Sequence, residues 1–294
     1  MKISYIHIIL FALFIVLPGY TIKRIDYRDG RYNNVCKDLK GDVLLYYVFI
    51  DSKETAPWTE FDIRSTIDSI HAATRWLQVQ AGMNNVSLHI IEDYYIGAEY
   101  TTLKKNLPEG TVYESITKPS LHKGIEEIND WADYIAKRVG NNFEIQDKEG
   151  IPEIKNPRNK ERLIALLRDR YNVESVALLF LVNNYYRSDI SVAVNTLSDN
   201  DVEFAIVSYK YPSDIAHSFL SLFGAAPMYE SLYRKNKNKI KLAQEYFPDD
   251  VMQDPYARPL NTLKIGPYTQ YLIGWTDELD PEYQPLLTDR IINF

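Results

Sequence analysis

The sequence predicts an α/β (α+β) protein, with a mixed, twisted sheet that includes an edge strand and is covered by packed helices. Strand-length apolar runs and amphipathic helical segments alternate in the first half of the chain. Three strand candidates then follow one another in quick succession. The 294 residues are 46% apolar, which is enough to bury one sizeable core.

The first strand–helix–strand unit begins with DVLLYYVFID (42–51). This nearly continuous apolar run is rich in Tyr, Val and Phe, as is typical of a strand buried on both faces. Thr59 and Asp62 approximate a capping box for the next segment, a helix expected to stop near Gly82. VSLHIIEDYY (86–95) is the second strand. Strand, helix and strand over about 50 residues predict a right-handed parallel crossover.

Two further helices are expected in the middle of the chain. Apolar residues on one stripe predict a helix over 120–140, and KERLIALLRDRY (160–171) also has helical character. The polar stretch 141–159 carries two prolines and is interpreted as a surface insertion. The three strand candidates are ESVALLFLVNN (174–184), ISVAVNTL (190–197) and VEFAIVSY (202–209).

The N-terminus is typical of a secretory signal, predicted here over residues 1–21. Lys2 precedes about a dozen mostly apolar residues, fewer than the ~20 needed to span hydrocarbon. We therefore expect export to the periplasm, cell surface or extracellular medium. An uncleaved membrane anchor stays open, because no clear A-x-A cleavage site is present. Residues 22–41 are expected to be a polar, irregular lead-in. Residues 42–294 should form one domain, with an N-terminal lobe to about residue 224 and a C-terminal lobe over about 225–294.

Charge and cysteine content exclude some classes of function. A formal net charge of -7 disfavours nucleic acid as a partner, because phosphate binding relies on clustered Lys and Arg. The basic run RKNKNKIK (234–241) is interpreted as the solvated face of a helix, with an anionic ligand as the alternative. The single cysteine, Cys36, cannot form an intrachain disulfide, and nothing nearby supports it as a nucleophile.

The stretch IAHSFLSLFGAAPMY (215–229) is the strongest functional signal. Ser213 is a suitable N-cap, and the apolar spacing predicts a helix from about 213 to Gly224. Positions 217 and 221 then share one face, one turn apart. That spacing lets two histidines of an H-E-x-x-H motif bind one zinc ion while the glutamate activates its water.

This stretch resembles the extended zinc helix of metzincin metallopeptidases, H-E-x-x-H-x-x-G-x-x-[HD]. On that pattern His217 takes the first ligand position, and Gly224 matches the glycine at which the family turns sharply. The base and the other two ligand positions are degenerate: Ser218, Ser221 and Pro227. Downstream, Met252 stands where a metzincin carries its Met-turn under the metal site. The resemblance implies a zincin-like fold over about residues 42–275, with a central former zinc helix.

The missing groups argue against zinc hydrolysis. Catalytic zinc needs three protein ligands, a water and a carboxylate base, whereas only His217 remains as a candidate ligand. We therefore expect no zinc or other cofactor and no catalytic residue in this helix. A metal site rebuilt with Asp214 or Glu230, and hence an active metal-dependent peptidase, stays open as an alternative. So does an unrelated secreted binding module.

Other enzyme classes have weaker support. No G-x-S-x-G elbow or G-x-x-x-x-G-K-[ST] loop occurs in the sequence. The metzincin resemblance implies a cleft in which an extended peptide lies along an edge strand, through main-chain hydrogen bonds. The candidate edge includes Ile190, Val192 and Val194. The sequence thus predicts an exported, catalytically inactive metallopeptidase-like protein, a pseudopeptidase that binds a peptide or protein partner.

Overall fold

The structure is a computed structural model. It describes residues 23–28, 35–36, 38–53, 55–97, 103–108, 121–141, 157–183, 190–192, 202–208, 211–231 and 234–291. The predicted signal segment lies outside these ranges. Among the described helices, none combines the length and the apolar character needed to cross a membrane.

In the described part of the chain, a six-stranded sheet has the order β3-β2-β5-β7-β6, with β4 also pairing with β2. All of its pairs are parallel except β6, which runs antiparallel to β7 at the sheet edge. The prediction of a mixed sheet with an edge strand is therefore confirmed; Val194 lies outside the described residues. The strands are β2 (Gly41–Asp51), β3 (Leu88–Tyr95), β4 (Leu103–Lys104), β5 (Ser175–Val182), β6 (Ile190–Val192) and β7 (Phe204–Val207).

The segments that form the two central strands, β2 and β5, do not alternate between apolar and polar residues, and their burial explains why. Every residue of β5 is buried, as is β2 from Val43 to Ile50. Both strands lie inside the sheet with helices on both faces, so neither face meets water. The apolar run at 42–51 was thus interpreted correctly as a doubly buried strand, and the strand candidate at 174–184 contains a second one, β5.

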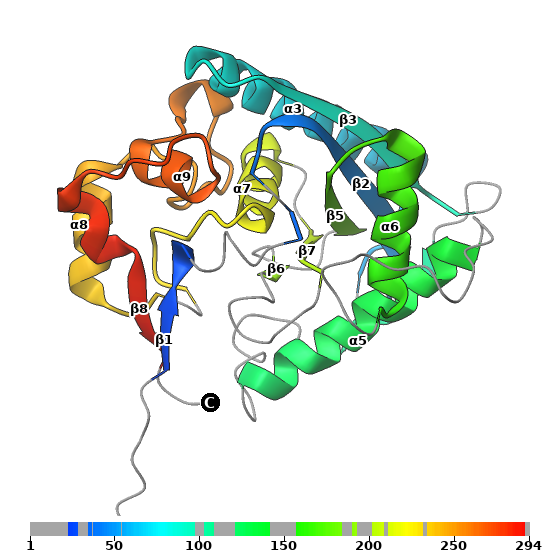
Figure 1. Ribbon diagram of the computed structural model, residues 1–294. Coiled ribbons are helices and arrows are strands. Elements are labelled where there is room, and N and C mark those ends of the chain that lie inside the picture. Colours follow the sequence, from blue (N-terminus) through cyan, green and yellow to red (C-terminus); the bar gives the residue numbers. More distant parts are fainter. Residues whose placement is uncertain are drawn as a thin grey trace, which may run out of the picture.

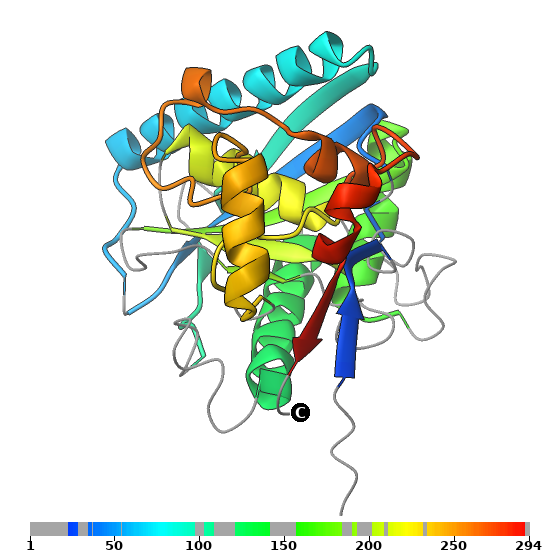
Figure 2. The ribbon, with the colours of Figure 1, turned by 90° about the vertical axis from the view of Figure 1, so that its left-hand side faces the viewer.

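Helices cover both faces of this sheet (Figures 1 and 2). On one side, α3 (Glu60–Met83) packs against β3 and against α7 (Pro212–Leu222). On the other, α5 (Leu121–Gly140) packs on α6 (Asn159–Tyr171), which contacts β5. The predicted capping box of α3 is present: the Asp62 backbone N–H donates to Thr59 Oγ1 at 3.1 Å.

Helix α7 begins slightly earlier than the sequence suggested. Its N-cap is Tyr211 and its first residue is Pro212, so the prediction of Ser213 as the cap is wrong. A proline at the first helical position has a suitable φ and no N–H to leave unpaired, which favours this start. Ser213 is buried inside the helix. Beyond the helix end, Gly224 adopts a φ of 93°, in the left-handed region that glycine tolerates best.

The C-terminal part of the chain packs beside α7, and the N-terminal strand joins it (Figure 1). β1 (Lys23–Asp26) pairs antiparallel with β8 (Thr288–Ile291), so the expected irregular lead-in is wrong for these residues. A four-residue strand has no detectable periodicity, and its partner lies at the other end of the sequence. The remaining elements are α8 (Lys237–Tyr246), η4 (Leu260–Thr262), α9 (Pro267–Leu272) and η5 (Pro281–Leu286).

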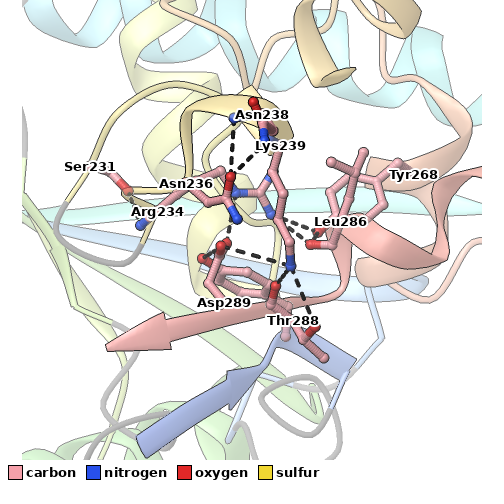
Figure 3. A network of polar contacts seen from close by, with 10 residues as sticks. Ser231, Arg234, Asn236, Asn238, Lys239, Tyr268, Leu286, Thr288 and Asp289 are labelled. Carbon is pink, nitrogen blue, oxygen red and sulfur yellow. Dashed lines mark hydrogen bonds and ion pairs between the residues drawn. The ribbon is translucent and has the colours of Figure 1, made fainter. Parts of the chain in front are cut away.

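The basic run 234–241 is solvated at Lys235, Lys237 and Lys241, as predicted, but Arg234 is an exception. Its side chain is fully buried, and its Nε donates to Asp289 Oδ2 at 3.0 Å (Figure 3). Its Nη2 donates to the Leu286 carbonyl at 2.7 Å and to the Tyr268 hydroxyl at 3.2 Å. The cause is local. Asn236 is the N-cap of α8, so Arg234 precedes the helix and its side chain can reach Asp289 near the end of the chain.

Candidate functional site

His217 lies on α7 and is held by the turn that contains Met252. Its Nδ1 is 3.0 Å from the Val251 carbonyl oxygen, and the residue is only 8% exposed. A carbonyl can only accept, so Nδ1 carries the proton and Nε2 keeps its lone pair. The Tyr229 hydroxyl lies 3.4 Å from Nε2, and the two rings are 5.8 Å apart. The imidazole is thus oriented through both of its nitrogens.

Burial keeps this imidazole neutral. Removal from water lowers the pKa of His217 below its usual 6.5, against the opposing effects of the Val251 hydrogen bond and the charge of Asp254. A neutral histidine with a protonated Nδ1 has the form that a metal ligand adopts through Nε2. Here the Tyr229 hydroxyl lies beside that nitrogen.

Asp250 fixes the turn that carries Met252. Its Oδ1 accepts from the Met252 N–H at 2.7 Å, while Oδ2 accepts from the Gly266 N–H at 2.7 Å and the Thr269 hydroxyl at 3.0 Å. Burial raises the pKa of Asp250 to about 6 in spite of these bonds. A Cβ on Gly266 would come within 2.7 Å of Oδ2, so glycine is needed there. Sequence reasoning missed Asp250, although Asp often forms a turn by accepting from the backbone N–H two residues further along the chain.

The three degenerate positions of the motif have other surroundings. Ser218 is fully buried within α7. The Ser221 hydroxyl donates to the His217 carbonyl at 3.0 Å, one turn back along the helix. Pro227 is half-buried and has no side-chain donor atom. The structure therefore brings Ser221 to the same side of α7 as His217 but commits its proton to the helix backbone.

Asp214, one turn before His217, is a buried carboxyl group. In the described part of the chain its Oδ2 has no hydrogen-bond partner. Burial and the charge of Asp254 raise the pKa of Asp214 to about 7, against a hydrogen bond from the Ala257 N–H. Glu230 is exposed. Within the described ranges, no three His, Cys, Asp or Glu side chains are grouped as ligands of a metal ion would be.

An aromatic pair lies next to these acidic residues. The rings of Tyr211 and Tyr256 meet edge to face with centroids 5.5 Å apart, and the residues are 43% and 51% exposed. Tyr211 caps α7, and Tyr256 donates its backbone N–H to the Asp254 carboxylate. Exposed tyrosines combine apolar area with a polar tip and suit contact with a ligand.

The edge strand β6 also contacts α7. It contains Ile190 and Val192, two of the predicted edge residues, and pairs with β7 on one side only in the described part of the chain. The outer side of such a strand offers backbone groups to which an extended chain can add.

A hollow of about 510 Å³ lies away from α7, at the carboxyl ends of β2 and β4. Such ends are a common ligand position in parallel sheets. Three of its lining residues are lysines, and Lys105 extends its Nζ over the Tyr134 ring at 4.0 Å. Sequence reasoning did not single out this region. The lining residues are Asp51, Ser52, Lys53, Thr55, Pro57, Lys104, Lys105 and Asn106, none of them on α7.

The fold and this site together define a class: an α/β protein whose parallel sheet ends in an antiparallel edge strand beside a histidine-bearing helix. No protein-family model and no curated protein matches the chain.

Proposed function

We propose that the chain is a zincin-like pseudopeptidase, which binds an extended peptide or protein segment beside β6 and does not hydrolyse it. The order of elements supports this reading. The strand β2, helix α3 and parallel strand β3 are followed by β4, the helices α5 and α6, the parallel strand β5, the antiparallel edge strand β6, the last parallel strand β7 and the helix α7 with His217. That order agrees with the N-terminal lobe expected from the metzincin resemblance.

The environment of His217 is the observation that carries the proposal. Histidines that bind metals almost always donate their other ring N–H to an oxygen such as a carbonyl. His217 has this outer hydrogen bond, to the residue directly before Met252. Its Nε2 faces the Tyr229 hydroxyl, and the Ser221 hydroxyl bonds to the helix backbone. This is the arrangement expected of a zinc helix whose other ligands have been replaced.

Hydrolysis also lacks a base at the expected position. A metalloprotease glutamate takes a proton from zinc-bound water, whereas the hydroxyl of Ser218 is scarcely basic and is buried. The features that suit binding are the side of β6 that pairs with no strand in the described part of the chain and the exposed pair Tyr211–Tyr256. The first offers main-chain hydrogen bonds, and the second offers aromatic contact area.

Metal analysis tests the zincin part of the proposal. We expect the purified protein to carry no stoichiometric zinc, and the rebuilt variant S218E/S221H/P227H/Y229F to bind one zinc ion per chain. The same variant with H217A is the matched control and should bind none. A rebuilt variant that folds but does not bind zinc would count against the zincin-like fold. Zinc in the unmodified protein, lost in both H217A and D214A, would instead support the active alternative with a rebuilt site.

Peptide selection tests the binding part. Peptides selected from a random display library should lose affinity roughly tenfold or more when alternate backbone amides are methylated, because strand addition uses those N–H groups. The Y211A/Y256A variant should weaken the same peptides, while Y246A, which changes an exposed tyrosine on α8, should not. Equal binding by methylated and unmethylated peptides would exclude pairing with β6.

A further inference from the structure

Lys160 is a fully buried lysine at the start of α6, and its Nζ is 3.0 Å from Oδ1 of Asn129. Asn129 lies on α5 and is only 5% exposed. Glu203, the residue just before β7, is also fully buried, and the charge of Lys160 acts on its carboxyl group. An amine, a side-chain amide and a carboxyl group thus lie together between two helices and the sheet.

Aromatic side chains surround this cluster. The Phe204 ring centroid is 4.9 Å from Lys160 Nζ, and Phe204 packs on Phe180 with ring centroids 5.6 Å apart. Phe180 in turn meets Trp131 edge to face at 5.4 Å. Charges are costly in such surroundings, whereas neutral groups are not.

The carboxyl group of Glu203 is suited to carry a proton. Its oxygens accept backbone N–H groups of Val35 and Cys36 at 3.0–3.2 Å, which favours the charged form. Burial nevertheless raises its pKa to about 7. Transfer of a proton from Lys160 to Glu203 would leave the amine neutral, with its lone pair available as a nucleophile.

We propose that Lys160 and Asn129 join in an intramolecular isopeptide bond, with Glu203 as the group that transfers the proton. The Nζ lone pair attacks Cγ of Asn129, and the Nζ–Cγ bond forms while the carbonyl π electrons move onto Oδ1. When the carbonyl re-forms, the Cγ–Nδ2 bond breaks and its electron pair leaves with nitrogen. Glu203 takes a proton from Nζ and gives one to the departing amine. The products are a secondary amide and one molecule of ammonia, so no oxidant or cofactor is needed.

The bond would link α5 covalently to α6, between residues 31 positions apart. Such a link restricts the unfolded chain in the way that a disulfide does. The chain has a single cysteine and so no intrachain disulfide. The cross-link is independent of the proposed binding function, because none of its residues lies on α7 or β6.

Mass spectrometry of the intact, denatured protein tests the proposal directly. After the N-terminus has been identified, we expect the mass to be lower than the sequence mass by one ammonia. Tandem spectra of a digest should show the peptide with Asn129 joined to the peptide with Lys160. Full mass, with the two residues in separate linear peptides, overturns the proposal whether or not any variant folds.

Variants locate the bond and the proton transfer. K160R keeps a long basic side chain and N129A keeps the lysine; each should restore the full mass. Loss of ammonia that persists in both would come from another site and would overturn the assignment. E203Q should leave a large fraction of the chains uncross-linked. A fully cross-linked E203Q protein would overturn the role given to Glu203.

Discussion

In the part of the chain that the structure describes, two basic side chains are completely buried, Arg234 and Lys160, and their hydrogen-bond partners differ. Each lies near an aromatic ring and a buried carboxyl group. The partners of Arg234 are a carboxylate, a hydroxyl and a carbonyl oxygen of the backbone. The Lys160 amine has a side-chain amide as a hydrogen-bond partner.

This difference separates a structural ion pair from a reactive cluster. A guanidinium does not lose its proton in proteins, so Arg234 can only remain charged and needs Asp289 beside it. A lysine amine, unlike a guanidinium, can lose its proton, and the Asn129 amide oxygen lies 3.0 Å from the Lys160 amine nitrogen. Burial of a base therefore has opposite consequences, which depend on whether the base can release its proton.

The largest expected effect comes from R234M, which removes one member of the buried ion pair. Asp289 would then be a buried carboxylate without its main partner, and such changes cost about 3–5 kcal/mol of unfolding free energy. Urea denaturation measures this loss. K237A, in the same basic run but exposed, is the matched control and should stay within about 0.5 kcal/mol of the unmodified protein. A loss below about 1 kcal/mol in R234M would mean that the Arg234 cluster does not stabilise the fold.

The loss of charge in K160M is expected to lower the unfolding free energy by less than the loss in R234M. The reason is that methionine, an apolar side chain of similar length, suits a buried site. The main cost of K160M should be the lost cross-link, about 4 kcal/mol for a loop of this size. N129A should show a similar loss, and the double variant should cost little more than either single one, because all three lack the same bond. Denaturation of the four proteins gives this cycle. Additive losses would show that the two side chains act separately.

Both clusters also show where sequence reasoning ends. The order and type of most strands and helices could be predicted, because apolar periodicity and caps such as Thr59–Asp62 are local signals. The burial of Arg234 could not be predicted, because its partner Asp289 lies 55 positions away and the surrounding basic run is typical of a solvated surface. The pairing of β1 with β8 was missed for the same reason.

The candidate site was predictable only in part. The helix pattern drew attention to His217, and the metzincin resemblance drew attention to Met252. The hydrogen bond from His217 to Val251 and the role of Asp250 depend on how a distant turn folds back onto α7. Lys160 looked like an ordinary polar residue at a helix start, because the amide that it meets lies on another helix.

The pH dependence of stability should separate the clusters further. The pKa of Glu203 is about 7 in the folded protein and 4.5 in its reference state, so folding favours the protonated form. Its contribution is complete below about pH 4.5 and is lost as the pH rises through 7, by about 3 kcal/mol. Asp214 and Asp250, with pKa values raised to about 7 and 6, act in the same direction. The unfolding free energy should therefore fall between pH 5 and pH 8.

E203Q should make this fall smaller, because glutamine does not titrate, whereas K237A, which changes an exposed lysine, should leave the slope unchanged. Urea denaturation of the three proteins at pH 5 and pH 8 provides the comparison. An equal slope in E203Q and the unmodified protein would show that Glu203 keeps an ordinary pKa. It would also remove the support that this group gives to proton transfer at Lys160.

The smallest expected effect is that of Y27F, which removes one hydroxyl from the Arg234 cluster. Tyr27 donates to Asp289 Oδ2 at 3.2 Å, the same oxygen that accepts from Arg234 at 3.0 Å. Since the guanidinium remains, the loss should be close to that of a single hydrogen bond, about 1 kcal/mol by urea denaturation. R234M removes the Arg234 donor and leaves Tyr27 as the donor to Asp289 Oδ2. In that background, Y27F should therefore cost more. A loss in Y27F as large as that in R234M would mean that the hydroxyl, and not the ion pair, compensates the buried charge of Asp289.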